Sequence, residues 1–238
     1  MPCETSMVTS NKLCILSKLR TRKQVAQLIC EAAIPTDRHV SSQALLLVSG
    51  GHKLREFARP VMGSALLDSF EMISTAAKLR NDGYIDQTTS LWAVENPLLD
   101  GPERLQKKIE AGAEAIVTQP PLLWDKYEQW WFASVSKGLI GTESQAKVIV
   151  GLPVIGSVDT LKFWMKLTHI HHLPESRDIL LKLEDEVQQN GKEAIFQWNK
   201  NNLVRAKGLA HVAGFHVMPI NKGGVIQTNR LIEEGLLE

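Results

Sequence analysis

The sequence predicts an α/β chain in which short parallel strands alternate with amphipathic helices. Short apolar runs such as Ala44–Val48 are followed by glycine, proline or asparagine, which end regular structure. Between them lie longer stretches whose apolar residues recur at helical spacing, as in Arg20–Ala33. No long stretch alternates polar and apolar residues. Together these observations favour a parallel sheet covered by helices.

The expected strands are the short apolar segments. The first full one, Ala44–Val48, reads ALLLV and is apolar at every position, which predicts burial on both faces. A weaker remnant of a strand is expected at Lys12–Leu16. The fourth strong strand is expected to break at Gly151 and Pro153. The five strong strands are Ala44–Val48, Ser90–Val94, Ala115–Thr118, Lys147–Val150 and Gly214–Met218.

The expected helices lie between these strands. Gly112 is a candidate C-cap of one helix, and Ser157 is a good N-cap for another. Two consecutive helices precede the last strand, and a terminal helix begins at Gly224. The predicted helices before it are Arg20–Ala33, Leu66–Arg80, Pro102–Ala111, Trp124–Lys137, the stretch from Ser157 through Leu167, Glu175–Gln189 and Lys192–Lys207.

Composition excludes several classes of function. The 27 Lys and Arg residues nearly balance the 26 Asp and Glu residues, so we expect no nucleic-acid or membrane partner. The three cysteines, Cys3, Cys14 and Cys30, are odd in number and lack C-x-x-C spacing, which argues against a disulfide framework or a zinc ribbon. The polar stretch Met1–Ser10 lacks an apolar signal region. We expect a cytoplasmic protein with one domain over residues 1–238, of which residues 1–11 are disordered.

Two architectures fit this pattern, a doubly wound open sheet and a (β/α)₈ barrel, and both place the functional site at the carboxyl ends of the strands. No dinucleotide, Walker A, nucleophile-elbow or zinc-protease motif is present. The residues at the expected strand ends are Ser49-Gly50-Gly51, Glu95-Asn96-Pro97, Thr118-Gln119-Pro120, Gly151-Leu152-Pro153 and Pro219-Ile220-Asn221. Only Glu95 among them titrates. This set of amides, glycines and prolines suits a flat polar ligand better than a metal or a nucleophile–base pair.

Three other features have both a structural and a functional interpretation. His169, His171 and His172 are interpreted as a surface loop, because the ligand spacing of known metal sites is missing. Trp124, Trp130 and Trp131 are expected to pack their helix rather than to stack nucleic-acid bases. Lys108 lies on an amphipathic helix, where a lysine is usually solvated, and Ser49-Gly50-Gly51 is either a plain turn or a phosphate cradle.

One block of the sequence resembles the methylenetetrahydrofolate reductases. The stretch LQKKIEAGAEAIVTQPPL, Leu105–Leu122, is similar to the helix, turn and strand of that family that end in Thr-Gln. The shorter pieces LLLVSGG, WAVENP, VIVGLPVIGS and GFHVMPIN follow in the family's order. The resemblance extends from Leu13 to Asn221.

The resemblance implies a barrel that binds FAD and a folate at its carboxyl face and uses NAD(P)H to reduce 5,10-methylenetetrahydrofolate to 5-methyltetrahydrofolate. It implies that Gln119 binds the folate or nicotinamide and that Lys108 faces the flavin diphosphate. Glu95 and Asn221 are expected at the substrate. The remaining residues expected at the cofactor are Gly50, Gly51, Ala93, Asn96 and Ala113.

The sequence also departs from the family pattern. Gly51 stands where the family has the Asp of a Gly-Asp pair, and Asn11 stands in place of a family His. The family's catalytic Glu has no counterpart, so no catalytic residue is assigned. We therefore expect an incomplete barrel that lacks its first one or two βα units, with missing N-terminal sequence, a partner or a second copy covering its open edges.

Three hypotheses follow from these observations. The first is an active flavin-dependent folate reductase. The second is a non-catalytic or truncated relative that keeps the scaffold and acts as a binding or regulatory protein. The third is a barrel of another class that binds a phosphorylated metabolite near Asn221–Gly224.

Overall fold

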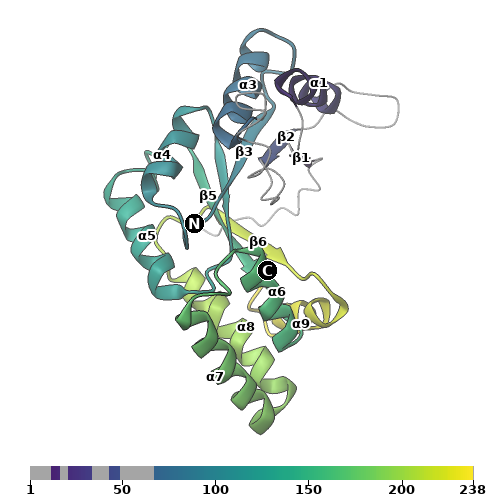
Figure 1. The fold of residues 1–238 in the computed structure, drawn as a ribbon, viewed down its shortest axis with the longest axis vertical. Coiled ribbons are helices and arrows are strands. Elements are labelled where there is room, and N and C mark those ends of the chain that lie inside the picture. The colour runs from purple at the N-terminus through teal and green to yellow at the C-terminus, as the bar shows by residue number, and fades with distance from the viewer. Residues whose placement is uncertain (1–11, 17–20, 34–42, 49–66, 238) are drawn as a thin grey trace. The chain divides into compact units, whose positions relative to one another are not determined.

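The computed structural model describes residues 12–16, 21–33, 43–48 and 67–237, and its strands and helices alternate as predicted (Figure 1). The strands are β1 (Lys12–Leu16), β2 (Ala44–Val48), β3 (Ser90–Glu95), β4 (Ala115–Thr118), β5 (Lys147–Pro153) and β6 (Gly214–Met218). The helices are α1 (Arg22–Ala33), α3 (Ser69–Asn81), α4 (Pro102–Glu110), α5 (Trp124–Ser136), α6 (Val158–Leu167), α7 (Pro174–Asn190), α8 (Lys192–Lys207) and α9 (Lys222–Glu233).

The strands form a sheet whose order follows the chain, β1-β2-β3-β4-β5-β6. β1 pairs with β2 in parallel from Lys12 to Leu16, which confirms the expected strand remnant. The pairs β2–β3 and β5–β6 are also parallel. A doubly wound sheet reverses its strand order near the middle, whereas a barrel keeps chain order. The described strands therefore have barrel-type order.

The chain divides into two compact units. The first comprises Met1–Val94 and Glu103–Ile116, and the second comprises Glu95–Pro102 and Val117–Glu238. The expected single domain over residues 1–238 stays a prediction, as does the expected loss of the first βα units. Residues 1–11 lie outside the described part of the chain, so their expected disorder stays a prediction too.

The core of the first unit forms where helices cover the sheet. Leu45 and Leu47 of β2 are fully buried, as are Leu91 and Ala93 on the buried face of β3. Helix α3 begins at a capping box, in which the Asp68 side chain accepts from the Glu71 backbone N–H and the Glu71 side chain accepts from the Asp68 backbone N–H. This cap starts the helix that buries Met72, Ile73 and Ala76.

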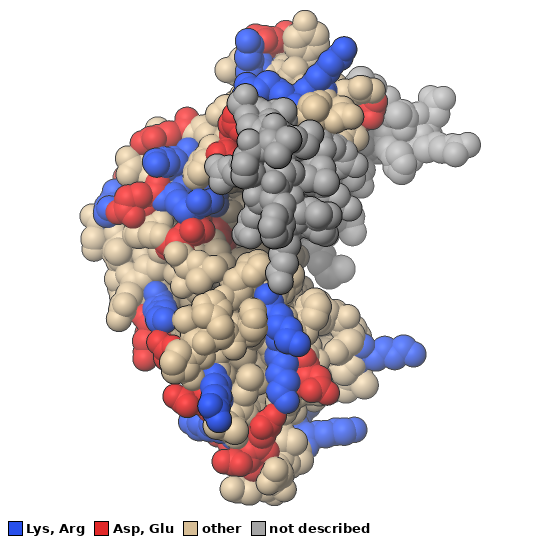
Figure 2. Space-filling model, in the orientation of Figure 1, with Lys and Arg blue, Asp and Glu red and all other residues tan. Residues whose placement is uncertain are grey.

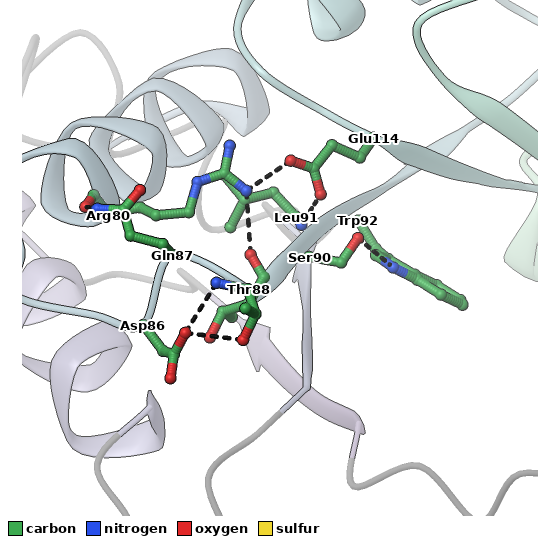
Figure 3. Close-up of polar contacts among 9 residues, drawn as sticks. Arg80, Asp86, Gln87, Thr88, Ser90, Leu91, Trp92 and Glu114 are labelled. Carbon is green, nitrogen blue, oxygen red and sulfur yellow. Dashed lines mark hydrogen bonds and ion pairs between the residues drawn. The ribbon is translucent and has the colours of Figure 1, made fainter.

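A polar network fixes the amino ends of β3 and β4 in the same unit (Figure 3). Arg80 Nη1 donates to the Thr89 carbonyl oxygen at 3.0 Å and to Glu114 Oε1 at 2.5 Å. The other oxygen of Glu114 accepts from the Leu91 backbone N–H at 3.3 Å. The network lies at the edge of the sheet opposite to the one where ligands bind in parallel α/β folds, so it holds the strands rather than a ligand.

The second unit has an aromatic core on α5. Tyr127, Trp130 and Trp131 are buried, and Tyr127 stacks on Trp131 with ring centroids 6.1 Å apart. The predicted packing role of these tryptophans is thus confirmed. Helices α7 and α8 lie side by side and are joined at Gly191, whose φ of +58° suits glycine (Figure 1).

Strand β5 is longer than predicted. It continues through Gly151 to Pro153 and pairs with β6 as far as Met218. The predicted break at Gly151 was wrong, whereas Pro153 is the last residue of the strand. Gly151 does not form a turn, because its role is to let another backbone come close. A Cβ on Gly151 would lie 2.2 Å from the Thr118 carbonyl oxygen. Glycine therefore permits a close approach of β5 to β4.

The terminal helix also starts earlier than predicted. Helix α9 begins at Lys222, with Asn221 as its N-cap, rather than at Gly224. No described helix is both long and apolar enough to cross a membrane. On the face drawn in Figure 2, blue and red side chains of the described residues are intermixed, as the net charge of +1 leads one to expect.

Replacing Gly151 by alanine should destabilise the protein by about 2 kcal/mol or more, because the added methyl group overlaps the backbone of β4. Urea unfolding monitored by circular dichroism measures this change. Gly141→Ala is the matched control, since a Cβ on Gly141 meets no atom within 4 Å. Equal stabilities of the two variants would contradict the close approach.

Candidate functional site

The carboxyl ends of β3, β4, β5 and β6 are joined by hydrogen bonds within the second unit. The Gln119 backbone N–H donates to the Glu95 carbonyl oxygen at 2.7 Å, which links the ends of β3 and β4. The Gly151 N–H donates to Thr118 Oγ1 at 3.1 Å, and the Val154 N–H to the Met218 carbonyl oxygen at 3.4 Å. These bonds form the carboxyl edge of the sheet, where ligands bind in parallel α/β folds.

A buried hydroxyl pair holds β4 in place. Thr118 Oγ1 lies 2.8 Å from Tyr127 Oη while it accepts from the Gly151 N–H. Both side chains are buried. Burial raises the pKa of the Tyr127 phenol far above its ordinary value, and the hydrogen bond with Thr118 only partly opposes this rise. Tyr127 therefore stays protonated and serves the strand, not an acid–base step.

Glu95, the titratable residue predicted at this edge, is fully buried. Its side chain shares a face of β3 with Leu91 and Ala93, because alternate residues of a strand point the same way. One carboxylate oxygen accepts from the Asn96 backbone N–H at 3.1 Å. The structure places this carboxylate inside the protein, and its predicted contact with a substrate stays a prediction.

The Asn96 side chain links the end of β3 to the carboxyl end of helix α6. Its side-chain oxygen accepts from the Leu98 N–H at 3.2 Å, and its Nδ2 donates to the Thr168 carbonyl oxygen at 3.3 Å. Thr168 ends α6, and the N-cap of α6, Ser157, follows β5. Helix α6 therefore runs from the end of β5 to the end of β3, past the intervening end of β4.

Helix α6 presents an apolar face that the sequence analysis missed. Phe163 is 48% exposed and Leu167 is 49% exposed, and residues four apart lie on one side of a helix. The buried stripe of α6 is formed instead by Leu161, Trp164 and Met165. The sequence did contain a sign of this exposed face. At helical spacing, Phe163 and Leu167 lie on another side of the helix than Leu161, Trp164 and Met165.

Gln119 has the freest polar side chain of the predicted substrate residues. It is half-buried at the end of β4 and is followed by the buried prolines Pro120 and Pro121. Its backbone is held by Glu95, but its side-chain amide has no hydrogen-bond partner among the described residues. This amide can donate two hydrogen bonds and accept two at a fixed position on the edge.

Asn221, in contrast, is engaged within the protein. Its side-chain oxygen accepts from the Gly224 N–H at 2.8 Å, and its Nδ2 donates to Thr160 Oγ1 at 2.8 Å. Gly223 and Gly224 pack against the backbone of Gly156, where a Cβ would lie within 2.5 Å of Gly223. The glycines thus serve close packing of α9. The predicted contact of Asn221 with substrate stays a prediction.

The described residues predicted at a flavin do not offer it a free group. Ala93 and Ala113 are buried. Lys108 is 3% exposed and donates to the Val94 carbonyl oxygen at 2.6 Å, so the usual expectation of a solvated lysine is wrong here. The Asn96 amide is engaged as described above. Gly50 and Gly51 lie outside the described residues, and the predicted contacts of this whole set with a flavin stay predictions.

The histidine loop shows no metal-binding geometry. His171 and His172 meet edge to face with ring centroids 5.6 Å apart, and both are exposed. His169 has a φ of +61° in the turn that ends α6. Within residues 12–16, 21–33, 43–48 and 67–237, no group of three or more His, Cys, Asp or Glu side chains could hold a metal ion.

Comparison with known proteins identifies a family. The family model of methylenetetrahydrofolate reductase matches residues 95–229, more than half of the chain, and confirms the resemblance seen in the sequence. A solved structure, an uncharacterized protein from Clostridium thermocellum that binds two copies of 5-methyl-5,6,7,8-tetrahydrofolic acid, shares the fold with a TM-score of 0.53 and 18% identity. The alignment covers 92% of this chain and 71% of that one. No curated protein sequence matches the chain. The predicted barrel-type α/β class is thereby confirmed.

Thr118→Val should destabilise the protein by about 2 kcal/mol, because it leaves the Gly151 N–H and the Tyr127 hydroxyl buried without their partner. Chemical denaturation measures the change. On a Tyr127→Phe background the same substitution should cost less, since one of the two orphaned groups is then gone. Identical costs on both backgrounds would show that the two hydroxyls do not interact.

Proposed function

The chain belongs to the methylenetetrahydrofolate reductase family, and we propose that it binds a reduced folate at the carboxyl edge of β3 and β4. The observation that supports this proposal most directly is the unpartnered side-chain amide of Gln119. The amide stands at the end of a strand inside the region that matches the family.

The chemistry of a pterin suits this amide. A pterin edge carries hydrogen-bond donors next to acceptors, and a glutamine side chain can satisfy both kinds without a change of charge. The backbone bond from Gln119 to Glu95 and the two following prolines limit the movement of this residue, which lowers the entropy lost on binding. The solved structure that binds 5-methyl-5,6,7,8-tetrahydrofolic acid supports the same ligand class.

We further propose that the exposed face of α6 contacts the flat part of the folate. Phe163 offers an aromatic ring, and Leu167 extends the apolar surface toward the end of β3. Aromatic rings stack favourably on flat heterocycles, and the gain exceeds that from buried area alone. Helix α6 would then form one side of the folate site and Gln119 another.

A finer proposal concerns the reaction. The family suggests flavin-dependent reduction of 5,10-methylenetetrahydrofolate to 5-methyltetrahydrofolate with NAD(P)H, in one-carbon and methionine metabolism. Gly51 in place of the family's Asp and the engagement of the Lys108 ammonium by the Val94 carbonyl favour the alternative, a relative that binds folate in a binding or regulatory role without catalysing the reduction. A cytoplasmic location and a partner or second copy at the sheet edges complete the proposal.

Gln119→Ala should weaken the binding of 5-methyltetrahydrofolate by about 1–3 kcal/mol, because a donor and an acceptor on the pterin edge lose their hydrogen-bond partner. Isothermal titration calorimetry measures this affinity. Gln189→Ala, which changes an exposed glutamine on α7, is the control and should bind as the unchanged protein does. Equal affinities of the Gln119 variant and the control would reject the assignment.

The absorbance spectrum of the purified protein separates the two finer proposals. An active reductase should carry a flavin absorbance band and oxidise NADH or NADPH only when 5,10-methylenetetrahydrofolate is added. A folded, colourless protein that still binds 5-methyltetrahydrofolate would contradict the reductase proposal and support the binding role. Loss of both properties would contradict the proposed function as a whole.

A further inference from the structure

A cavity lies in the second unit, between helices α5, α7 and α8. Its volume is about 740 Å³, which is within the usual range of pockets for small organic ligands. Leu122, Leu123, Ile179 and Leu183 give it an apolar wall. None of the residues assigned above to the folate site lines it.

Two sets of ion pairs lie around the cavity, so several of its charged side chains already have partners within the protein. Arg205 pairs with Glu128 at 2.7 Å, and its guanidinium lies 5.0 Å from the centre of the Trp124 ring. The Trp124 indole N–H donates to Asn202 Oδ1 at 2.6 Å. Lys126 of α5 pairs with Glu175 of α7 at 3.0 Å. These contacts hold the three helices in register around the open space.

Other groups on the wall have no partner. The side chains of Trp198, Asn201 and Glu186 make no hydrogen bond, ion pair or ring contact with any described residue. Trp198 and Glu186 are half-buried, whereas a solvated surface residue would be more exposed. The cavity thus presents an open indole ring, an open amide and an open carboxylate.

The α7–α8 hairpin brings these three groups to one part of the cavity. The two helices turn at Gly191 and lie side by side (Figure 1). Glu186 lies five residues before that glycine and Trp198 seven residues after it, so they occupy facing turns of the hairpin. Asn201 follows Trp198 by three residues and shares its helix face.

The charges on the wall that have no partner among the described residues are acidic in excess by one. Of the lining residues, Asp125, Glu175, Asp178 and Glu186 are acidic, and Lys126, Lys182 and Arg205 are basic. Arg205 pairs with Asp125 and Lys126 with Glu175, which leaves Asp178 and Glu186 against Lys182. A flat ligand that offers two adjacent N–H donors to a carboxylate suits this wall, because such a pair forms parallel, charge-assisted hydrogen bonds.

We propose that this cavity binds a flat, uncharged heterocycle whose amino group adjoins a ring amide N–H, as in the 2-amino-4-oxo edge of pterin and the 2-amino-6-oxo edge of guanine. The ring stacks on Trp198, the adjacent ring N–H and 2-amino groups donate to Glu186, and Asn201 binds the polar rim of the ring. The site is separate from the folate site and does not depend on it.

Calorimetric titration of the full chain with guanosine tests the proposal. Glu186→Gln keeps the shape of the side chain but loses its charge, and it should weaken guanosine binding at least tenfold. Asp185→Asn, an exposed neighbour on α7 that does not line the cavity, should leave the affinity unchanged. Adenosine, which lacks the paired donor edge, should bind at least tenfold more weakly than guanosine.

Trp198→Leu provides a second readout. It should remove the quenching of indole fluorescence that guanosine causes in the unchanged protein. Gln119→Ala should leave guanosine binding intact, so failure of the folate proposal and failure of this one are distinguishable. No binding of guanosine, or equal binding by the Glu186→Gln and Asp185→Asn variants, would overturn the proposal.

Discussion

The close approach of β5 to β4 at Gly151 is the constraint on which the candidate site depends. Without a side chain at Gly151, the backbone N–H reaches the Thr118 hydroxyl, and that hydroxyl in turn meets the buried phenol of Tyr127. These contacts fix the last residue of β4. Gln119 is the next residue, so its position depends on the contacts that Thr118 makes with Gly151 and Tyr127.

Much of the fold could be predicted because local signals agree with the tertiary structure. Every strong strand and every helix named from the sequence is present, and the boundaries mostly differ by one to three residues. The end of β5, three residues later than predicted, shows why such a boundary is missed. Gly151 and Pro153 were interpreted as breakers of β5, yet a glycine inside a strand also marks a place where another backbone comes near. A single sequence contains no signal that distinguishes the two uses.

The site was predicted less completely, because side-chain partners come from distant elements. The amphipathic pattern of α4 marks Lys108 as exposed, but the fold turns its ammonium onto the backbone of β3. Asn221 was predicted at a ligand from its place after β6, and the sequence did not show that its side chain also caps α9. The path of α6 across the strand ends rests on one bond between Asn96 and Thr168, residues that are far apart in the sequence. Gln119 could be placed at the end of a strand because the strand pattern and the resemblance of Leu105–Leu122 to the family both predict this position.

The central claim is that a reduced folate is held by the side chain of Gln119 at the carboxyl edge of the sheet. A crystal structure of the full chain with 5-methyltetrahydrofolate tests this claim most directly. The account predicts a pterin ring within about 3 Å of the Gln119 amide, the distance of an ordinary hydrogen bond. A folate bound elsewhere, with the Gln119 side chain pointing away from it, would contradict the account.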